Sequence, residues 1–353
     1  MLDFKHNLNY FFQIQDIMHN YLTCQRTNML VSNEPRLKHL PAPLFAVIMG
    51  LSGLTIVFQK AASIFDYPQI FGNIFAFLTT SAFIGLSFAY LMKFINYRQA
   101  VINEFNHPIR LNFFPAFSIC LLLLSIIFEH ISPSTSQILW FIGTPIHFGF
   151  TIYVVRFWIV NNFEITHSNP AWFIPIVGNV LVPILGAKYA GVEVATFFFS
   201  IGMFFWIVMF SIILNRIIFH HQLAAKFLPT LFIFIAPAGI GCIAYQKIDF
   251  AMTGTMQMNM LGYALFDIGL FFTILLFAMW KEFAKIGFAI TWWAYTFPMA
   301  AITIATIMVF SITKNIGLFW LSQLLIAITT SLVLLVMIKT IKAVKNKEVC
   351  IKE

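Results

Sequence analysis

The chain is poor in charged residues: Asp, Glu, Lys and Arg make up 10% of its 353 residues, against about 25% in an ordinary soluble protein. Hydrophobic residues make up 60%, and the mean hydropathy is +0.86. This scarcity of charge excludes a soluble globular domain. The alternation of apolar and polar residues typical of a transmembrane barrel is also missing. Long uninterrupted apolar blocks instead indicate an all-α, polytopic membrane protein.

The residues that chemistry usually needs are scarce as well. Four cysteines (Cys24, Cys120, Cys242 and Cys350) show no paired spacing, so we expect neither a disulfide framework nor a metal site. His147 is the one histidine deep inside an apolar block, which disfavours a haem held by paired histidines. Paired carboxylates, a glycine-rich phosphate loop and a nucleophile elbow are all missing. We therefore expect no enzyme, no cofactor and no metal.

Ten apolar blocks are long enough to cross a bilayer. They are approximately 43–59, 70–95, 112–128, 137–160, 171–187, 191–214, 228–246, 257–280, 287–311 and 316–338. Short connections make successive helices antiparallel, which gives five hairpins in one membrane domain, residues 41–340. A polar segment, 1–40, with a short amphipathic helix near residues 10–21 precedes this domain, and a basic tail, 341–353, follows it.

Basic residues are distributed unevenly between the two sides of the membrane. With the N-terminus inside, seventeen Lys and Arg residues fall on the cytoplasmic side and four on the other, namely Lys60, Lys188, Lys247 and Lys314. This bias predicts cytoplasmic termini. Topology therefore explains the net charge of +8, and no nucleic-acid partner is expected.

Helix-breaking residues concentrate in the odd-numbered blocks. These residues are Gly50, Gly53, Pro115, Pro175, Gly178, Pro183, Pro237, Gly239, Gly241 and Pro298, whereas the even blocks contain a single interior proline, Pro145. Irregular backbone is tolerated at membrane depth where it lines a cavity. The pattern predicts an inner ring of five kinked helices around a pore, enclosed by five straighter ones. The alternative is that these breaks only allow close helix packing.

The ninth block shows both readings most clearly. Gly287–Phe310 is 24 residues long and carries no ionisable side chain. Pro298 lies near its middle, where a proline removes a backbone donor and bends a helix. Phe297, next to that break, is a large side chain that fits a cavity wall. The segment is either a buried helix with an ordinary kink or a helix that lines a pore.

Ionisable residues are missing from the interior of all odd blocks. Asp267 and His147 are the clear exceptions inside the membrane, and both lie on even blocks. Each has either a structural hydrogen-bonding role or a proton-coupling role, and Arg156 is a candidate partner for either. A pore wall without charge has no arginine clamp for a dicarboxylate, but it passes anions weakly under a positive field.

Three stretches carry a family resemblance. They are EFNHPIRLNFFPAF at Glu104–Phe117, HSNPAWFIPIVGN with VLVPILGAKYAGVEVA at His167–Ala195, and WWAYTFPMA at Trp292–Ala300. IAPAG at Ile235–Gly239 adds weaker support. Over residues 40–340 the chain resembles the family of plant slow-type anion channels and bacterial tellurite-resistance/C4-dicarboxylate transporter proteins.

The resemblance implies a homotrimer in which each protomer has its own conduit for anions such as chloride or nitrate. It implies that a phenylalanine on the ninth helix, here Phe297, occludes the pore, and that Arg110 lies at the cytoplasmic mouth. The bacterial likeness predicts an inner-membrane location. Candidate pore-lining residues are Gly50, Gly53, Pro115, Pro175, Gly178, Pro237, Gly239, Trp293, Pro298 and Ala301.

The leading hypothesis is therefore a passive, low-affinity anion channel gated by Phe297, with small inorganic or organic anions and the lipid bilayer as partners. The alternative is a secondary carrier of a C4-dicarboxylate, sulfite or a tellurite-type oxyanion, linked to protons through Asp267. A receptor-like membrane scaffold is a third and weaker hypothesis.

Overall fold

The computed structural model of the chain describes residues 35–220 and 222–350. These residues contain helices and no strand, and ten of their helical segments are long and apolar enough to cross a membrane. The prediction of an all-α, polytopic membrane protein is confirmed. The amphipathic helix expected near residues 10–21 lies outside the described residues.

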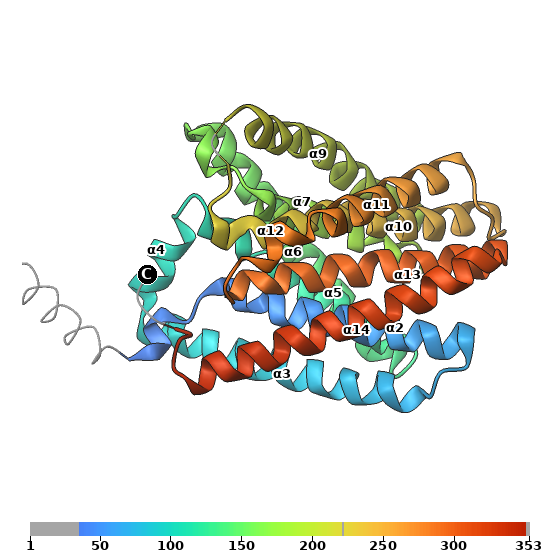
Figure 1. The fold of residues 1–353 in the computed structure, drawn as a ribbon, viewed down its shortest axis with the longest axis horizontal. Coiled ribbons are helices and arrows are strands. Elements are labelled where there is room, and N and C mark those ends of the chain that lie inside the picture. Colours follow the sequence, from blue (N-terminus) through green and yellow to red (C-terminus); the bar gives the residue numbers. More distant parts are fainter. Residues whose placement is uncertain (1–34, 221, 351–353) are drawn as a thin grey trace, which may run out of the picture.

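The spanning helices form five antiparallel pairs (Figure 1). We call the first member of each pair an inner helix: α2 (Phe45–Phe65), α5 (Ala116–Phe128), α7 (Ile174–Leu181) with α8 (Pro183–Tyr189), α10 (Ile235–Thr253) and α13 (Thr296–Thr313). The second members are the outer helices: α3 (Gln69–Asn96), α6 (Pro133–Val160), α9 (Val192–Phe219), α11 (Met260–Ala278) and α14 (Ile316–Lys345). Two short helices, α4 (Arg98–Phe105) and α12 (Trp280–Ala284), lie in connections between pairs.

The two ends of the bundle differ. Short turns join each inner helix to its outer partner at one end, which we call the hairpin end. The start of α2, the end of α14 and the longer connections lie at the other, which we call the terminal end. Because α14 continues to Lys345, the boundary predicted at residue 340 falls inside a helix. Lys342 and Lys345 in its last turn interact favourably with the negative end of the helix dipole.

Burial separates the inner from the outer helices. In the five inner segments 72–89% of the most apolar window is buried, against 17–39% in the five outer ones. The outer helices expose large apolar side chains such as Phe77 and Phe204, as expected for surfaces that face lipid. The prediction of a ring of five inner helices enclosed by five outer ones is therefore confirmed.

A 3-10 segment precedes every inner helix. These segments are η2 (Ala42–Leu44), η3 (Arg110–Phe113), η5 (Pro170–Phe173), η6 (Ala225–Phe234) and η7 (Ile290–Tyr295). Pro115, Pro175, Pro237 and Pro298 each lie within the first turn of the following α-helix or directly before it.

This arrangement corrects the expected position of the Pro298 break. The sequence placed Pro298 near the middle of one continuous helix, but α13 begins at Thr296. In the first turn of a helix the backbone N–H has no intrahelical partner, so proline costs little there. The irregularity is a change from 3-10 to α-helix, and no proline kink inside the α-helix is involved.

Candidate functional site

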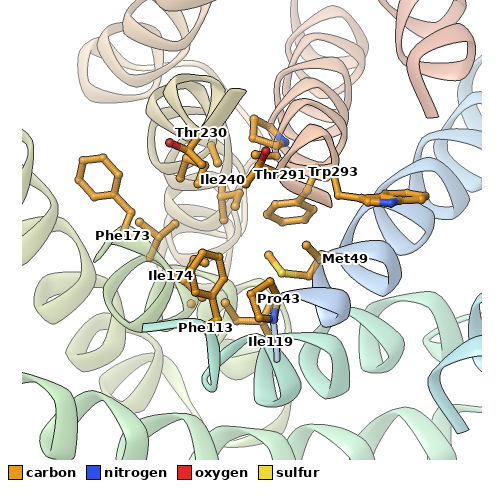
Figure 2. Close-up of a pocket in the computed structure, with 18 of the residues that line it drawn as sticks. Pro43, Met49, Phe113, Ile119, Phe173, Ile174, Thr230, Ile240, Thr291 and Trp293 are labelled. Atoms are coloured by element: carbon orange, nitrogen blue, oxygen red, sulfur yellow. The ribbon is translucent and has the colours of Figure 1, made fainter. Parts of the chain in front are cut away.

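A cavity of about 70 Å³ lies between the inner helices (Figure 2). Every inner helix, together with the 3-10 segment before it, contributes to its wall. The lining includes Pro43 and Met49 from the first inner segment, Phe113 and Ile119 from the second, Phe173, Ile174 and Gly178 from the third, Thr230 and Ile240 from the fourth, and Thr291, Trp293, Phe297 and Pro298 from the fifth. A buried water needs about 10–15 Å³, so the cavity has room for only a few.

Among the described residues, none that lines the cavity carries an ionisable side chain. Its two hydroxyl groups are committed to backbone carbonyls: Thr230 Oγ1 donates to Phe227 O at 2.6 Å, and Thr291 Oγ1 donates to Lys226 O at 2.5 Å. The Trp293 indole donates away from the cavity, to Thr340 Oγ1 on α14 at 2.9 Å. An ion in the cavity therefore meets apolar side chains and the backbone.

The backbone supplies an electrostatic bias in place of charged side chains. The lining residues fall at the starts of the five inner helices, so five helix N-termini converge on the cavity. Each N-terminus carries a partial positive charge of roughly half an elementary charge from the aligned peptide dipoles. The aligned backbone dipoles therefore make the electrostatic potential at the cavity positive.

Phe297 is the second residue of α13 and lines the cavity, with 9% of its surface exposed. Gly53 of α2 faces it: a Cβ at Gly53 would lie 3.4 Å from the edge of the Phe297 ring and 2.6 Å from Ala300 Cβ. The missing side chain at Gly53 thus allows α2 to approach α13 beside Phe297.

The candidate pore-lining residues divide into two groups. Gly178, Trp293 and Pro298 line the cavity with Phe297. Gly50 packs against Trp293 and Thr296, and Gly239 packs against the backbone of Ala301, where an added Cβ would lie 3.1 Å from the Ala301 carbonyl carbon. Pro115, Pro175, Pro237 and Ala301 are not part of the cavity wall. The structure gives Gly50, Gly53 and Gly239 close contacts with the α13 segment.

Arg110 and Asp267 lie away from the cavity. Arg110 begins η3, at the terminal end of the second inner segment, and is half-buried. Its backbone N–H donates to His107 Nδ1 at 3.3 Å. Asp267 lies midway along α11 on an exposed face. Of these two predicted site residues, Arg110 is at the end where a cytoplasmic mouth is expected, and Asp267 is on the outer layer.

His147 of α6 is fully buried directly behind the cavity wall. Its Nδ1 lies 2.9 Å from Ser118 Oγ. Ser118 Oγ also lies 2.8 Å from Pro115 O, so this hydroxyl connects the His147 ring with the backbone at the start of α5. Nε2 has no hydrogen-bond partner among the described residues. The ring occupies the space that a side chain at Gly178 would fill.

Two polar residues that the sequence did not single out complete this contact between helices. Thr151, one turn after His147 on α6, donates to Pro175 O at 2.8 Å, and Asn179 of α7 donates to Thr151 Oγ1 at 2.9 Å. His147 and Thr151 are four residues apart and so share a helix face. The four-residue spacing of His147 and Thr151 is the sequence signal that could have identified this contact.

A second polar network at the terminal end was also missed. Lys93 of α3 and Glu104 of α4 form a buried ion pair at 2.6 Å. Glu104 also accepts the Ala42 backbone N–H at 2.8 Å and the Tyr90 hydroxyl at 2.9 Å. Lys93 additionally donates to Leu40 O at 2.7 Å. The network holds the segment that leads directly to Pro43 in the cavity wall.

Comparison with known proteins gives consistent results. The family described as voltage-dependent anion channels matches residues 39–341. The S-type anion channel SLAH2 of Arabidopsis thaliana is 29% identical over 282 residues, which is 77% of this chain and 53% of the relative. A tellurite resistance protein TehA homolog of Haemophilus influenzae is 25% identical over 264 residues, 74% of this chain and 79% of the relative.

A transporter of Methanocaldococcus jannaschii is 26% identical over 318 residues, 81% of this chain and 91% of the relative. The chain spans about half the length of three of the plant relatives that it matches, the S-type anion channels SLAH2, SLAH3 and SLAC1. The matched range includes all five inner segments and the entire cavity wall. This multi-pass membrane protein, with its uncharged cavity between five helix N-termini, belongs to the voltage-dependent anion channel family.

Proposed function

We propose that the protein is a passive, low-affinity anion channel in which Phe297 closes the pore. The observation that carries the proposal is the composition of the cavity: five inner helices enclose it, five helix N-termini point into it, and Phe297 is part of its wall. A site without a basic side chain holds an anion weakly, and weak binding is what conduction requires.

The proposed substrates are monovalent anions such as chloride and nitrate. A multiply charged dicarboxylate would lose much of its hydration in this cavity and would find no arginine or lysine there to replace it. The names of the relatives, which include anion channels and a tellurite resistance protein, support anion transport in general.

The proposed assembly follows the resemblance. Each protomer of a homotrimer contains its own pore, and the protein lies in a bacterial inner membrane with both termini in the cytoplasm. The terminal end is then the cytoplasmic end and the hairpin end faces the other compartment.

The deciding experiment is anion flux and single-channel recording with Phe297→Ala in reconstituted bilayers. If the ring adds about 1.4 kcal/mol or more to the barrier, its removal raises conductance at least about tenfold. Chloride, nitrate, malate and tellurite are compared in the same preparation.

Phe58→Ala is the matched control. Phe58 is buried on α2 to a similar degree, 8% exposed, but stacks on Phe75 of α3 outside the cavity. We expect the Phe58→Ala variant to lose a comparable amount of packing without opening the pore. A folded Phe297→Ala protein that conducts no better than wild type would refute the gate.

The secondary-carrier alternative makes different predictions. It requires saturable counterflow and a pH-dependent rate that Asp267→Asn abolishes. The exposed position of Asp267 on α11, outside the cavity wall, disfavours direct contact between this carboxylate and an ion in the pore.

A further inference from the structure

Charged residues gather at the hairpin end, where the inner helices finish. Glu129 follows α5, Lys188 lies in the last turn of α8, and Lys60 and Lys247 lie five and six residues before the ends of α2 and α10. We call these four residues the hairpin-end cluster. It draws on four of the five inner helices, and neither the gate nor the cavity uses it.

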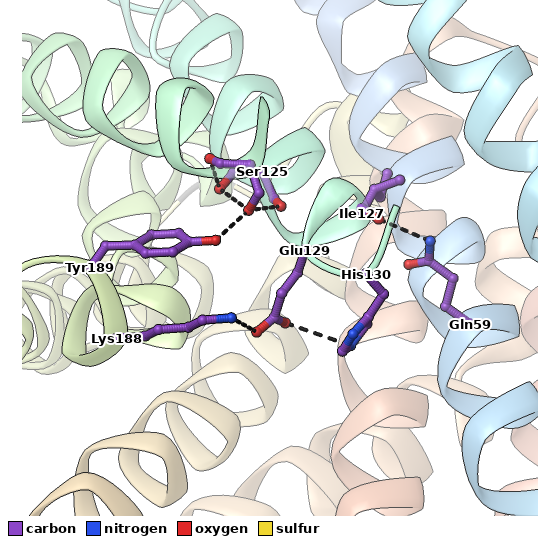
Figure 3. Close-up of polar contacts among 8 residues, drawn as sticks. Gln59, Ser125, Ile127, Glu129, His130, Lys188 and Tyr189 are labelled. Atoms are coloured by element: carbon purple, nitrogen blue, oxygen red, sulfur yellow. Dashed lines mark hydrogen bonds and ion pairs between the residues drawn. The ribbon is translucent and has the colours of Figure 1, made fainter. Parts of the chain in front are cut away.

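Direct contacts and charge interactions hold the cluster together. Lys188 Nζ lies 3.1 Å from Glu129 Oε1, and His130 Nε2 lies 3.8 Å from Glu129 Oε2 (Figure 3). Glu129 also interacts electrostatically with Lys247, and Lys60 with both Lys247 and Glu129. Gln59 fixes the neighbouring backbone by donating to Ile127 O at 3.0 Å. The charges are therefore close enough to act together.

Two of the lysines lie on the helix faces that line the cavity. Lys247 follows the lining residue Ile240 by seven positions on α10, and Lys60 follows Met49 by eleven on α2. Residues seven or eleven apart lie within about 20° of each other around an α-helix of 3.6 residues per turn. At a rise of 1.5 Å per residue, these lysines lie about 10 and 16 Å farther along the same path.

Within the cluster three lysines face one carboxylate, which leaves an excess of two positive charges with His130 neutral and leaves room for another anion. Asp66, Glu193 and Asp249 are at the same end of the bundle, but they are not among the charges that act on Lys60 or Glu129. Lys60 is half-buried beside Lys247, and two ammonium groups in a region of low dielectric repel each other. An anion between them relieves that repulsion, as Glu129 does for Lys188.

The helix dipoles explain why a channel would need these charges. The same alignment that turns five N-termini toward the cavity turns five C-termini toward the hairpin end, each with a partial charge of about −0.5. That field opposes an anion entering or leaving the pore. Lys188 lies in the last turn of α8, where a lysine caps the negative end of the helix. The dipole effect fades within one turn, and Lys60 and Lys247 lie more than one turn before the ends of their helices, so capping does not explain these two lysines.

We infer that Lys60, Lys188 and Lys247 form an anion-recruitment site at the hairpin end of the pore, and that Glu129 is a tethered anion that competes for it. The ligand class is a small anion, inorganic or a short carboxylate. The inference rests on the proposed channel function, because it describes the same conduction path.

The test is single-channel recording in the Phe297→Ala background, with anion varied separately on each face of the membrane. Glu129→Gln removes the competing charge and raises current at low chloride on the hairpin-end face about two- to threefold. Lys60→Gln and Lys247→Gln lower it by a similar factor. Both effects are large near 0.01 M salt, where the Debye length is about 30 Å, and small near 1 M, where it is about 3 Å.

Lys314→Gln is the matched control, since Lys314 is at the same end but lies over the Phe310 ring at 5.8 Å. We expect Lys314→Gln to leave the dependence of current on chloride concentration unchanged. The inference is overturned if Glu129→Gln and Lys60→Gln change the current in the same direction, match Lys314→Gln, or act equally at high salt.

A binding measurement separates this inference from the proposed function. Chloride NMR line broadening on the solubilised full-length protein reports ion exchange at the cluster whether or not the pore conducts. If Phe297→Ala carries no current, the channel proposal fails, but Glu129→Gln still increases the broadening and Lys60→Gln still reduces it. Equal broadening in wild type and both variants overturns the recruitment site.

Discussion

Gly178 is the position where the cavity wall makes room for an ionisable side chain. The His147 ring lies in the space of the missing side chain, and a Cβ there would also come within 2.9 Å of Ile119 Cγ1. The ring edge with Nε2 is turned toward this glycine, and a Cβ there would clash with Nε2. Gly178 is thus a packing requirement of His147 as well as part of the cavity wall.

We expect Gly178→Ala to destabilise the protein by about 1–3 kcal/mol, because overpacking a rigid site forces its neighbours to move. Thermal unfolding of the solubilised protein measures the effect. Gly85→Ala is the control, since no atom of the described residues lies within 4 Å of a Cβ at Gly85 of α3. Combining Gly178→Ala with His147→Ala should cost less than the sum of the two changes, and additivity would contradict the close contact.

At the scale of single residues, the sequence predicted which residues are unusual better than it predicted which residues they contact. His147 and Phe297 stand out because each is an unusual residue in an apolar block. His147 contacts Ser118 of α5, and the neighbouring contact between α6 and α7 is made by Thr151 and Asn179. These are ordinary Ser, Thr and Asn side chains, which the linear pattern does not connect. Gly53 and Gly239 show the same limit. The sequence does not distinguish a glycine that lines a cavity from one that allows two helices to approach, and only the packing in the structure does.

Among the elements, the 3-10 segments before the inner helices are what shape the site. They bring the start of each α-helix to the cavity and place each nearby proline where its missing N–H costs little. Hydropathy located the ten spans with each end within seven residues of its place in the structure, because a bilayer fixes their length and composition. It did not separate 3-10 from α-helix, since both are equally apolar here. For that reason the sequence alone predicts Pro298 near the middle of a helix, whereas in the structure it is the third residue of α13.

The Lys93–Glu104 pair connects three elements at the terminal end: α3, α4 and the segment before η2. We expect Glu104→Gln to destabilise the protein by about 3–5 kcal/mol, because Lys93 is only 3% exposed and would keep a buried charge without its counter-ion. Denaturant or thermal unfolding measures the loss. A double change, Lys93→Met with Glu104→Gln, should recover a large part of it, and no recovery would show that the backbone contacts of Glu104 matter more than the charge.

For the whole molecule, five parallel inner helices produce one electrostatic field along the bundle, positive at the cavity and negative at the hairpin end. The sequence contained the lysines that oppose the negative end, but their positions indicated only topology. Their grouping depends on which helices are neighbours across the ring, and hydropathy does not determine that. Asp267 illustrates the converse, because a charge that looks functional in the sequence lies on the exposed side of α11.

The same cluster predicts how stability depends on pH. Burial alone would raise the pKa of Glu129, but the hydrogen bond and charge of Lys188, with the charges of Lys247 and His130, outweigh it and hold that pKa below 4.5. A carboxylate whose pKa is lower in the folded state stabilises the fold above its unfolded value of 4.5 and loses that contribution as pH falls through the folded value. The Glu129 contribution is therefore constant above about pH 5.5 and declines below pH 4.5.

Thermal unfolding of wild type and Glu129→Gln is measured across this pH range. The difference in stability between the two proteins gives the contribution of Glu129, because distant groups titrate equally in both. The comparison is made with His130→Gln in both proteins, because His130 is the nearest other group that changes charge in the range. We expect wild type to be the more stable protein at neutral pH and the two to converge in acid, since protonated Glu129 and the glutamine that replaces it are both neutral. A stability difference that instead grows as pH falls below 4.5 would mean that the lysines do not hold this carboxylate in its ionised form.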